Sequence, residues 1–167
     1  MPAIWWARRD LRLSDNPALS AALETDQLVI PLFIIDPQLM NRYATAERRV
    51  AFLLRGLANM DAELHARGSR LWVRKGEPLQ VLQELVRETG AEHIYAERDV
   101  WPYGRQRDAR IAQDLPLDLV DGVTLLPSGS VLKDDGQPYT VFTPYSRRWH
   151  ETLEARGGLA LLPSRCL

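Results

Sequence analysis

The chain alternates short apolar runs with stretches in which apolar residues recur at helical spacing. Four of the runs have the length of β-strands and the near-continuous apolar character of strands that are covered on both faces. A fifth run is a weaker candidate. The expected strands are AIWWA (3–7), LVIPLFII (28–35), RLWVR (70–74), HIYAE (93–97) and, as the weaker candidate, LDLVDG (117–122).

Helices are expected between these strands, and their start signals are visible in the sequence. Asp15 or Asn16 can cap a helix that has Pro17 in its first turn and runs to about Glu24. The longest helix is expected over 45–67, where apolar residues repeat every three or four positions. Further helices are expected from Pro78 to Gly90, from about Arg105 to Asp114, and over 146–156.

Strands that alternate with helices imply right-handed crossovers and a mostly parallel sheet with helices on both faces. The pattern therefore predicts an α/β domain of three layers. After Val123 it changes to loops and short extended pieces, and the end, RGGLALLPSRCL, has the Gly/Pro character of a linker. We expect the domain to cover 1–157 and an interdomain linker to begin at 158–167, as in one domain of a longer protein.

Composition adds limits to this picture. The 167 residues include 46% hydrophobic and 26% charged residues, as in a soluble globular protein, and the net charge of −1 argues against a surface built wholly around nucleic acid. The single cysteine, Cys166, allows no internal disulfide and is typical of a reducing compartment. No signal peptide and no run of 18 apolar residues are present. We therefore expect a cytoplasmic protein with no membrane partner.

The residues that follow the strands are the informative ones, because ligands of open parallel sheets bind outside the carboxyl ends of the strands. The first strand lacks the glycine-rich turn that would follow it in a dinucleotide site, and neither GxGxxG nor GxxxxGK[ST] occurs. A standard NAD or ATP site is therefore not expected. Charged residues occupy these positions instead: Arg8, Arg9 and Asp10 after the first strand, Asp36 after the second, Glu77 after the third, and Arg98 and Asp99 after the fourth.

The arginines after the first strand have two interpretations. Arg8, Asp10 and Arg12 would form ion pairs that hold the first turn and a neighbouring loop or domain. Alternatively, one guanidinium faces the cleft and recognises an anionic or planar aromatic ligand. Strand alternation sends Arg8 and Arg9 to opposite sides, so both interpretations can hold together, although residue chemistry alone favours the structural one.

Other residue types predict no catalytic or metal centre. The three histidines have no metal-ligand spacing with one another or with Cys166. A catalytic Cys–His pair is not expected, because Cys166 lies in the terminal tail. The five tryptophans are interpreted as packing residues and not as an electron-transfer chain.

Five sequence blocks, taken together and in order, resemble the DNA photolyase/cryptochrome family over residues 3 to about 149. Each block alone is a weak signal, but the set is highly specific. The blocks are WWARRDLRLSDNPAL, PLFIIDPQL, RLWVRKGEP, YAERDVWPYGRQRD and GQPYTVFTPYSRRW. The resemblance implies a Rossmann-like domain whose five-stranded parallel sheet has the order 3-2-1-4-5.

The same resemblance implies that this chain is the amino-terminal half of a light-driven DNA repair enzyme, with the cyclobutane pyrimidine dimer class favoured. Family members carry a second, all-helical domain that binds the catalytic FAD and contacts the damaged DNA. That domain is absent here, so repair by residues 1–167 alone is not expected. The implied partners are the helical FAD domain, damaged DNA through the parent protein, and a second copy of the isolated domain through self-association.

In this family the amino-terminal domain binds an antenna chromophore, which absorbs light and passes the excitation to the flavin. The folate-binding branch carries an Asn-Glu pair where this chain has Tyr103 and Gly104. The resemblance therefore favours 8-hydroxy-5-deazaflavin or a flavin over methenyltetrahydrofolate. Trp101 stands where the favoured branch often has an acidic residue, and its indole would either stack on the ring or block it. The implied chromophore-binding residues are Arg9, Ile34, Ile35, Asp36, Asp99, Trp101 and Arg105.

Two other functions fit the sequence less well. A cryptochrome-type photoreceptor domain with an empty pocket would serve as a docking module for the helical domain. An independent nucleotide-binding domain of the same broad fold is disfavoured by the missing phosphate loop. The absent carboxyl-terminal sequence or an absorption spectrum with candidate chromophores would separate the first of these from the antenna function.

Overall fold

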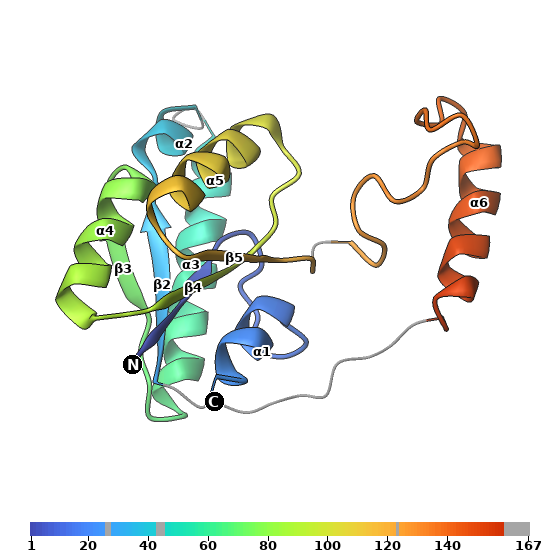
Figure 1. The fold of residues 1–167 in the computed structure, drawn as a ribbon. Helices are drawn as coiled ribbons and strands as arrows, with labels where there is room; N and C mark the ends of the chain where they lie inside the picture. The colour runs from blue at the N-terminus through green and yellow to red at the C-terminus, as the bar shows by residue number, and fades with distance from the viewer. Residues whose placement is uncertain (26–27, 43–45, 123, 159–167) are drawn as a thin grey trace.

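The computed structural model describes residues 1–25, 28–42, 46–122 and 124–158. Five parallel strands form one sheet of order β3-β2-β1-β4-β5, which confirms the predicted fold class and strand order (Figure 1). The elements are β1 Ala3–Ala7, α1 Pro17–Leu23, β2 Val29–Ile35, α2 Pro37–Arg42, α3 Glu47–His65, β3 Trp72–Lys75, α4 Pro78–Thr89, β4 His93–Glu97, α5 Pro102–Asp114, β5 Leu117–Val120 and α6 Phe142–Ala155.

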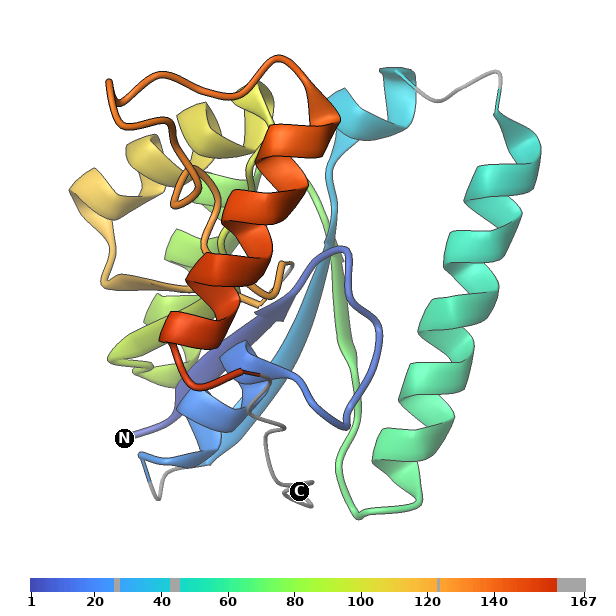
Figure 2. The same cartoon turned by 90° about the vertical axis from the view of Figure 1, so that its right-hand side faces the viewer.

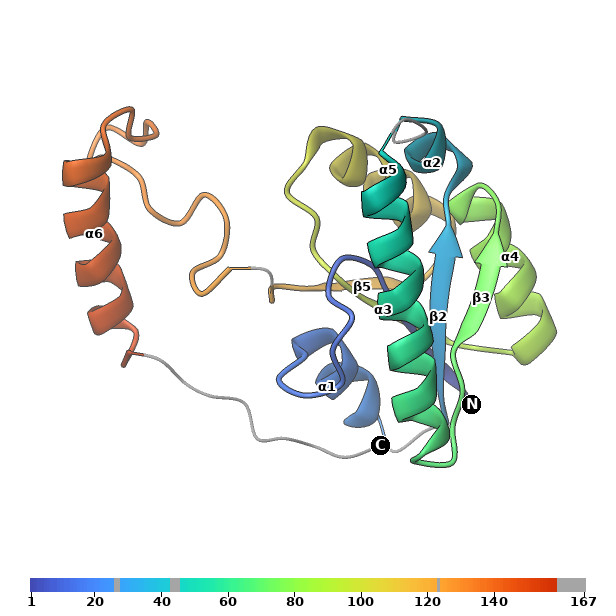
Figure 3. The ribbon, with the colours of Figure 1, turned by 180° about the vertical axis from the view of Figure 1, so that it is seen from behind.

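Helices cover both faces of the sheet, as the sequence predicts. The side chains of β1 alternate between the two faces: Ile4 and Trp6 join the core formed with α4 and α5, whereas Trp5 and Ala7 join the core formed with α1 and α3. Both cores are fully buried at their centres. Figures 2 and 3 show the ribbon from two further sides, with α3 on one face of the sheet and α4 on the other. A strand buried on both faces explains why β1 is apolar at every position.

The ends of two helices follow their sequence signals. The Asn16 side chain accepts a hydrogen bond from the Leu19 N–H at 2.9 Å and caps α1, whose first residue is Pro17. At α4, the Glu77 carboxylate accepts from the Gln80 N–H at 3.0 Å. The helix ends at Gly90, whose φ of +69° belongs to the left-handed region that glycine adopts without strain.

Some boundaries differ from the prediction. The six residues of α2, one residue after β2, were not among the expected helices, because a helix this short shows no periodicity in sequence. Helices α5 and α6 begin earlier than expected, at Pro102 and Phe142. Residues 159–167, which hold Cys166 and nearly all of the expected linker, lie outside the described residues.

Helix α6 lies apart from the sheet and the other helices (Figures 1 and 3). It has no buried residue, and Phe142 at its first position is 77% exposed. Val141 and Tyr145 beside it are also exposed. The described helices include none that is long and apolar enough to cross a membrane.

Candidate functional site

A cavity of about 1000 Å³ opens at the carboxyl edge of the sheet, where β1, β2 and β4 end. We call it the carboxyl-edge cavity. Its position is the one at which open parallel sheets bind ligands. The lining residues are Trp6, Ala7, Arg8, Arg9, Phe33, Ile34, Asp36, Gln38, Leu39, Arg42, Arg49, Pro78, Asp99, Trp101, Pro102, Tyr103, Gly104, Gln106 and Arg107.

The walls of the cavity combine apolar and aromatic groups with charged ones. Trp6 and Ile34 come from the α4/α5 core, and Phe33 comes from the α1/α3 core, so the cavity spans the edge of the sheet and not one face. Trp101, which is 61% exposed, and the half-buried Tyr103 add aromatic surface from the start of α5. Such walls suit a planar ring that is fixed by a few polar groups.

Five of the seven residues predicted for chromophore binding line the carboxyl-edge cavity: Arg9, Ile34, Asp36, Asp99 and Trp101. The other two do not. Ile35 packs against the α1/α3 core, because adjacent strand residues alternate between the faces. Arg105 is exposed on α5, whose inward face carries Gly104, Asp108 and Ile111.

Arg8 and Arg9 diverge, as strand alternation predicts. Arg9 is 54% exposed at the cavity, with its Nη1 3.8 Å from Asp99 Oδ1. Arg8 is buried, and its Nη1 donates to Asp108 Oδ2 at 2.8 Å and to the Glu97 carbonyl at 3.0 Å. Arg8 therefore holds α5 against the sheet.

The loop after β1 is held by a different arginine. Arg12 Nε lies 3.1 Å from Asp10 Oδ2, and its guanidinium also donates to the Asp15 carbonyl. The expected ion pairing within the first turn is thus formed by Arg12 and Asp10. Arg8 also forms an ion pair, but its partner is Asp108 on α5 and not a residue of the first turn.

Asp108 joins Arg8 to Arg107 in a buried cluster, the Arg8–Asp108–Arg107 cluster. Arg107 Nε donates to Asp108 Oδ1 at 3.0 Å, and the Asp108 side chain is only 3% exposed. Both guanidinium groups also lie against the Trp6 ring. The distance from the guanidinium carbon to the ring centroid is 3.8 Å for Arg8 and 4.9 Å for Arg107. Burial, and next the positive charge of Arg107, lower the pKa of Arg8 to about 10, so Arg8 is still a cation at neutral pH.

Asp99 and Gly104 form the wall at the start of α5. Asp99 Oδ1 accepts from the Trp101 N–H at 3.1 Å, and Asp99 Oδ2 lies 3.7 Å from Arg107 Nη2. A Cβ at position 104 would lie 2.3 Å from Asp99 Cγ. Only glycine therefore allows the Asp99 carboxylate to pack this closely against the helix.

Asp36 and Tyr103 close the side of the cavity between β2 and α5. The Tyr103 hydroxyl donates a hydrogen bond to Asp36 Oδ2, and Asp36 Oδ1 accepts from the Gln38 N–H at 2.8 Å. Burial, and then the hydrogen bond to Asp36 and its charge, raise the pKa of Tyr103 to about 12. Tyr103 is thus a neutral donor that fixes the Asp36 carboxylate in the wall.

Several residues of this site were not predicted for it from the sequence, and three of them form its hydrogen bonds and ion pairs. Tyr103, Arg107 and Asp108 all lie on α5, which the sequence presents as a polar surface helix. The block YGRQRD contains all three and was used only as a family signature. Its residues 104 and 108, one helical turn apart, mark the inward face in the structure.

A carboxyl group outside the cavity is also strongly perturbed. Glu97 at the end of β4 is 7% exposed, and its Oε1 is buried without a hydrogen bond among the described residues. Asp10 and Arg12, which pair with each other at 3.1 Å, lie close to it. Burial, and next the negative charge of Asp10, raise the pKa of Glu97 from 4.5 to about 7.

Stability is therefore expected to fall as the pH rises from about 4.5 to about 7. The folded chain holds the Glu97 proton over this range and the unfolded chain does not, so raising the pH favours unfolding. We expect Glu97→Gln to remove a decrease on the order of 2 kcal/mol between pH 5 and pH 8. Urea denaturation across this range measures the effect. The exposed Glu92→Gln is the matched control, and an unchanged pH dependence in Glu97→Gln would contradict the assignment.

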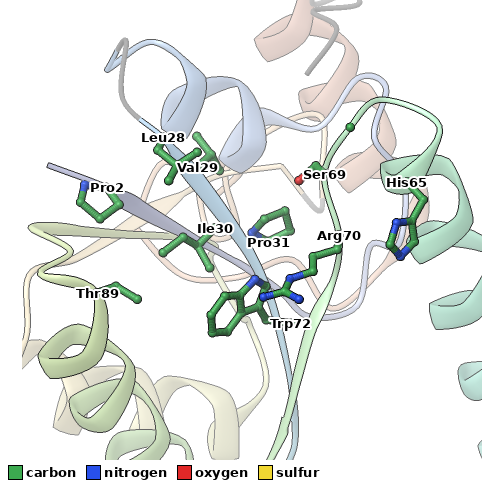
Figure 4. A pocket seen from close by; sticks show the side chains of 11 residues that line it. Pro2, Leu28, Val29, Ile30, Pro31, His65, Ser69, Arg70, Trp72 and Thr89 are labelled. Carbon is green, nitrogen blue, oxygen red and sulfur yellow. The ribbon is translucent and has the colours of Figure 1, made fainter.

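A second, smaller pocket of about 500 Å³ lies at the opposite edge, beside the amino-terminal ends of β2 and β3 (Figure 4). Arg70 stacks on Trp72 there, with 4.9 Å between the guanidinium carbon and the ring centroid. Pro2, Leu28 and Pro31 supply apolar walls. None of the predicted site residues lines it, and it lies at the edge that open α/β folds do not use for ligands.

Comparison with known proteins places the chain in a family. Residues 3–164 match the family model of DNA photolyase. The deoxyribodipyrimidine photo-lyase of a Synechococcus species is 35% identical over 153 residues, which are 89% of this chain and 32% of that protein. An enzyme of the same name from Thermus thermophilus is 38% identical over 149 residues, 89% of this chain and 34% of that protein. Cryptochrome-2 of Gallus gallus is 39% identical over 109 residues, 65% of this chain and 19% of that protein.

Solved structures agree with these relatives. An archaeal photolyase from Sulfolobus tokodaii with two FAD molecules has a TM-score of 0.82 and 28% identity, over all of this chain and 37% of that one. A bacterial class III photolyase from Agrobacterium tumefaciens has a TM-score of 0.75 and 30% identity, over 89% of this chain and 31% of that one. The chain spans about a third of the length of these photolyases and 19% of the length of the cryptochrome. It belongs to the DNA photolyase family and corresponds to the amino-terminal α/β domain of its members.

Proposed function

We propose that this chain is the antenna domain of a light-driven DNA photolyase and that the carboxyl-edge cavity binds the antenna chromophore. The observation that carries the proposal is the cavity itself: about 1000 Å³, apolar and aromatic walls, and charged groups already fixed by hydrogen bonds. An antenna needs no acid, base or nucleophile. The protein has to fix the position and orientation of the ring and shield it from water.

A flavin or 8-hydroxy-5-deazaflavin fits this proposal better than methenyltetrahydrofolate. The tyrosine and glycine that replace the folate branch's Asn-Glu pair are committed to other contacts. Tyr103 donates to Asp36, and Gly104 makes room for Asp99. The Sulfolobus tokodaii photolyase was described with two FAD molecules and with the implication of a novel light-harvesting cofactor, which supports a flavin as a candidate for this chain.

Repair of pyrimidine dimers is proposed for the whole protein and not for residues 1–167. In that protein a helical FAD-binding domain would contact the damaged DNA. The exposed Val141, Phe142 and Tyr145 at the start of α6 supply apolar surface on which such a domain would pack. In the isolated chain the same surface would favour self-association.

The test is binding of candidate chromophores to the purified chain, followed by absorption and fluorescence. We expect a flavin or 8-hydroxy-5-deazaflavin to bind, and Arg9→Ala to weaken that binding about tenfold, because the exposed guanidinium lines the cavity and would contact a ring bound there. Arg98→Ala is the matched control, since Arg98 is similarly exposed after β4 but does not line the cavity. If none of these chromophores binds and Arg9→Ala changes stability alone, the antenna function is wrong. An empty cavity would favour the cryptochrome-type docking module instead.

A further inference from the structure

The smaller pocket, beside the amino-terminal ends of β2 and β3, has walls that the antenna function does not use (Figure 4). We call it the amino-edge pocket. Its volume of about 500 Å³ lies within the range of about 300–1000 Å³ that is typical of small-molecule sites. Pro2, Leu28, Ile30 and Pro31 supply apolar walls, and Trp72 adds an aromatic one. Because open α/β folds bind their ligands at the other edge, the inference rests on these side chains and not on the position of the pocket.

Arg70 is a lining cation without an acidic partner among the residues that the structure describes. Its guanidinium carbon lies 4.9 Å from the centroid of the Trp72 ring, and Figure 4 shows the two side chains next to each other. Arg74 flanks the same ring at 5.4 Å, but it pairs with Glu88 at 3.1 Å and does not line the pocket. A guanidinium that stacks on an indole keeps the N–H groups at its edge available to an acceptor.

The other polar side chains of the pocket add no further net charge for a ligand. His65 is 62% exposed, and its Nε2 lies 3.6 Å from Asp61 Oδ2, so a nearby carboxylate offsets any positive charge on the imidazole. The Thr89 hydroxyl donates to the Leu85 carbonyl at 2.7 Å, and Ser69 carries a hydroxyl without charge. The pocket therefore offers one uncompensated positive charge, which suits a monoanion better than a phosphate dianion.

The apolar walls indicate what the rest of the ligand is like. Leu28 lines the pocket and is 74% exposed, so a ligand with an apolar body would remove this side chain from water. A carboxylate carries a single charge and accepts two parallel hydrogen bonds from a guanidinium. We propose that the amino-edge pocket binds a small carboxylate with an apolar body, the carboxylate on Arg70 and the body against Leu28 and Pro31. This would be a second ligand site, independent of the antenna function.

The experiment uses three probes with the purified 167-residue chain. Phenylacetate has the charge and the apolar body, phenylacetamide has the same body without the charge, and acetate has the charge without the ring. Binding is followed by NMR from the shift of the Trp72 indole N–H signal, which Trp72→Phe identifies. We expect phenylacetate to bind at least about tenfold more tightly than either of the others, and added salt to reduce its preference over phenylacetamide.

Two variants separate the roles of the charge and of the apolar wall. Arg70→Gln should lower the affinity for phenylacetate to that for phenylacetamide. Leu28→Ser, at an exposed position, should weaken the binding of both aromatic probes and keep the preference between them. Arg67→Gln is the matched control and should change neither affinity, because Arg67 is exposed just before β3 but does not line the pocket.

Equal binding of phenylacetate and phenylacetamide would overturn the carboxylate site, as would a preference that survives in Arg70→Gln. Equal binding of acetate and phenylacetate would overturn the apolar part of the proposal. A chain that does not bind phenylacetate would overturn the whole of it. None of these results bears on the binding of a chromophore in the carboxyl-edge cavity, so the antenna function stands or falls separately.

Discussion

Replacing Asp108 with alanine is expected to lower the free energy of unfolding by about 3–5 kcal/mol, the largest effect of any change considered for this protein. The side chains of Asp108 and Arg8 are 3% and 6% exposed, so the variant would leave a largely buried guanidinium without its counter-ion. Arg8 would keep only the Glu97 carbonyl as a hydrogen-bond acceptor among the described residues. It would also face Arg107 with no anion between them.

Urea denaturation of the unmodified chain and of Asp108→Ala measures this loss of stability. Asp114→Ala is the matched control, because Asp114 is an exposed aspartate at the end of the same helix, and little change is expected there. If Asp108→Ala were no less stable than Asp114→Ala, the Arg8–Asp108–Arg107 cluster would contribute nothing to the fold. Asp108→Asn keeps one hydrogen-bond acceptor without the charge. Its free energy of unfolding should lie between those of Asp108→Ala and Asp114→Ala.

Replacing Gly104 with alanine is expected to destabilise the protein by about 1–3 kcal/mol. The sign of this change in unfolding free energy is informative, because replacing glycine with alanine inside an exposed helix usually stabilises a protein by up to about 1 kcal/mol. Here the new Cβ would lie 2.3 Å from Asp99 Cγ and 2.5 Å from Asp99 Cβ, so the whole side chain would have to move. Its contacts with Arg9 and Arg107 would be lost, and chromophore affinity should fall with them.

Urea denaturation of Gly104→Ala measures the loss of stability, and flavin titration measures the loss of chromophore affinity. The exposed Gln113→Ala on the same helix is the control, and it should leave stability nearly unchanged. Gly104→Ala/Asp99→Gly removes the overlapping atoms and should recover stability relative to Gly104→Ala. A stabilising Gly104→Ala would show that Asp99 does not pack against the helix as described.

Much of the fold follows from the sequence because the sheet is buried. The strands Ala3–Ala7 and His93–Glu97 were predicted to the residue, since continuous apolar runs between polar turns leave little choice of boundary. The order of the strands came from the family resemblance and not from periodicity. Helix α2 was missed because six residues, none of them buried, carry no amphipathic pattern.

The candidate site also contains residues that the sequence predicts and residues that it does not. Residues directly after strands, such as Arg9, Asp36 and Asp99, could be placed at the cavity because the carboxyl ends of parallel strands meet at one edge. Asp108 could not, because its burial depends on Arg8, which is one hundred residues away in the chain. The polar sequence around Asp108 predicts a solvent-exposed side chain. Its burial follows only from the tertiary contact with Arg8.

The separation of α6 from the sheet has a consequence for cooperativity. A helix of 14 residues without a buried face gains little from tertiary packing, and isolated helices of this length are marginal in water. Helix α6 should therefore open and close as a local unit, at a much lower free energy than the β1–β5 sheet with α1 and α3–α5. Global unfolding of the chain would then report on the sheet unit, and the helical state of α6 would depend on whatever surface packs against it.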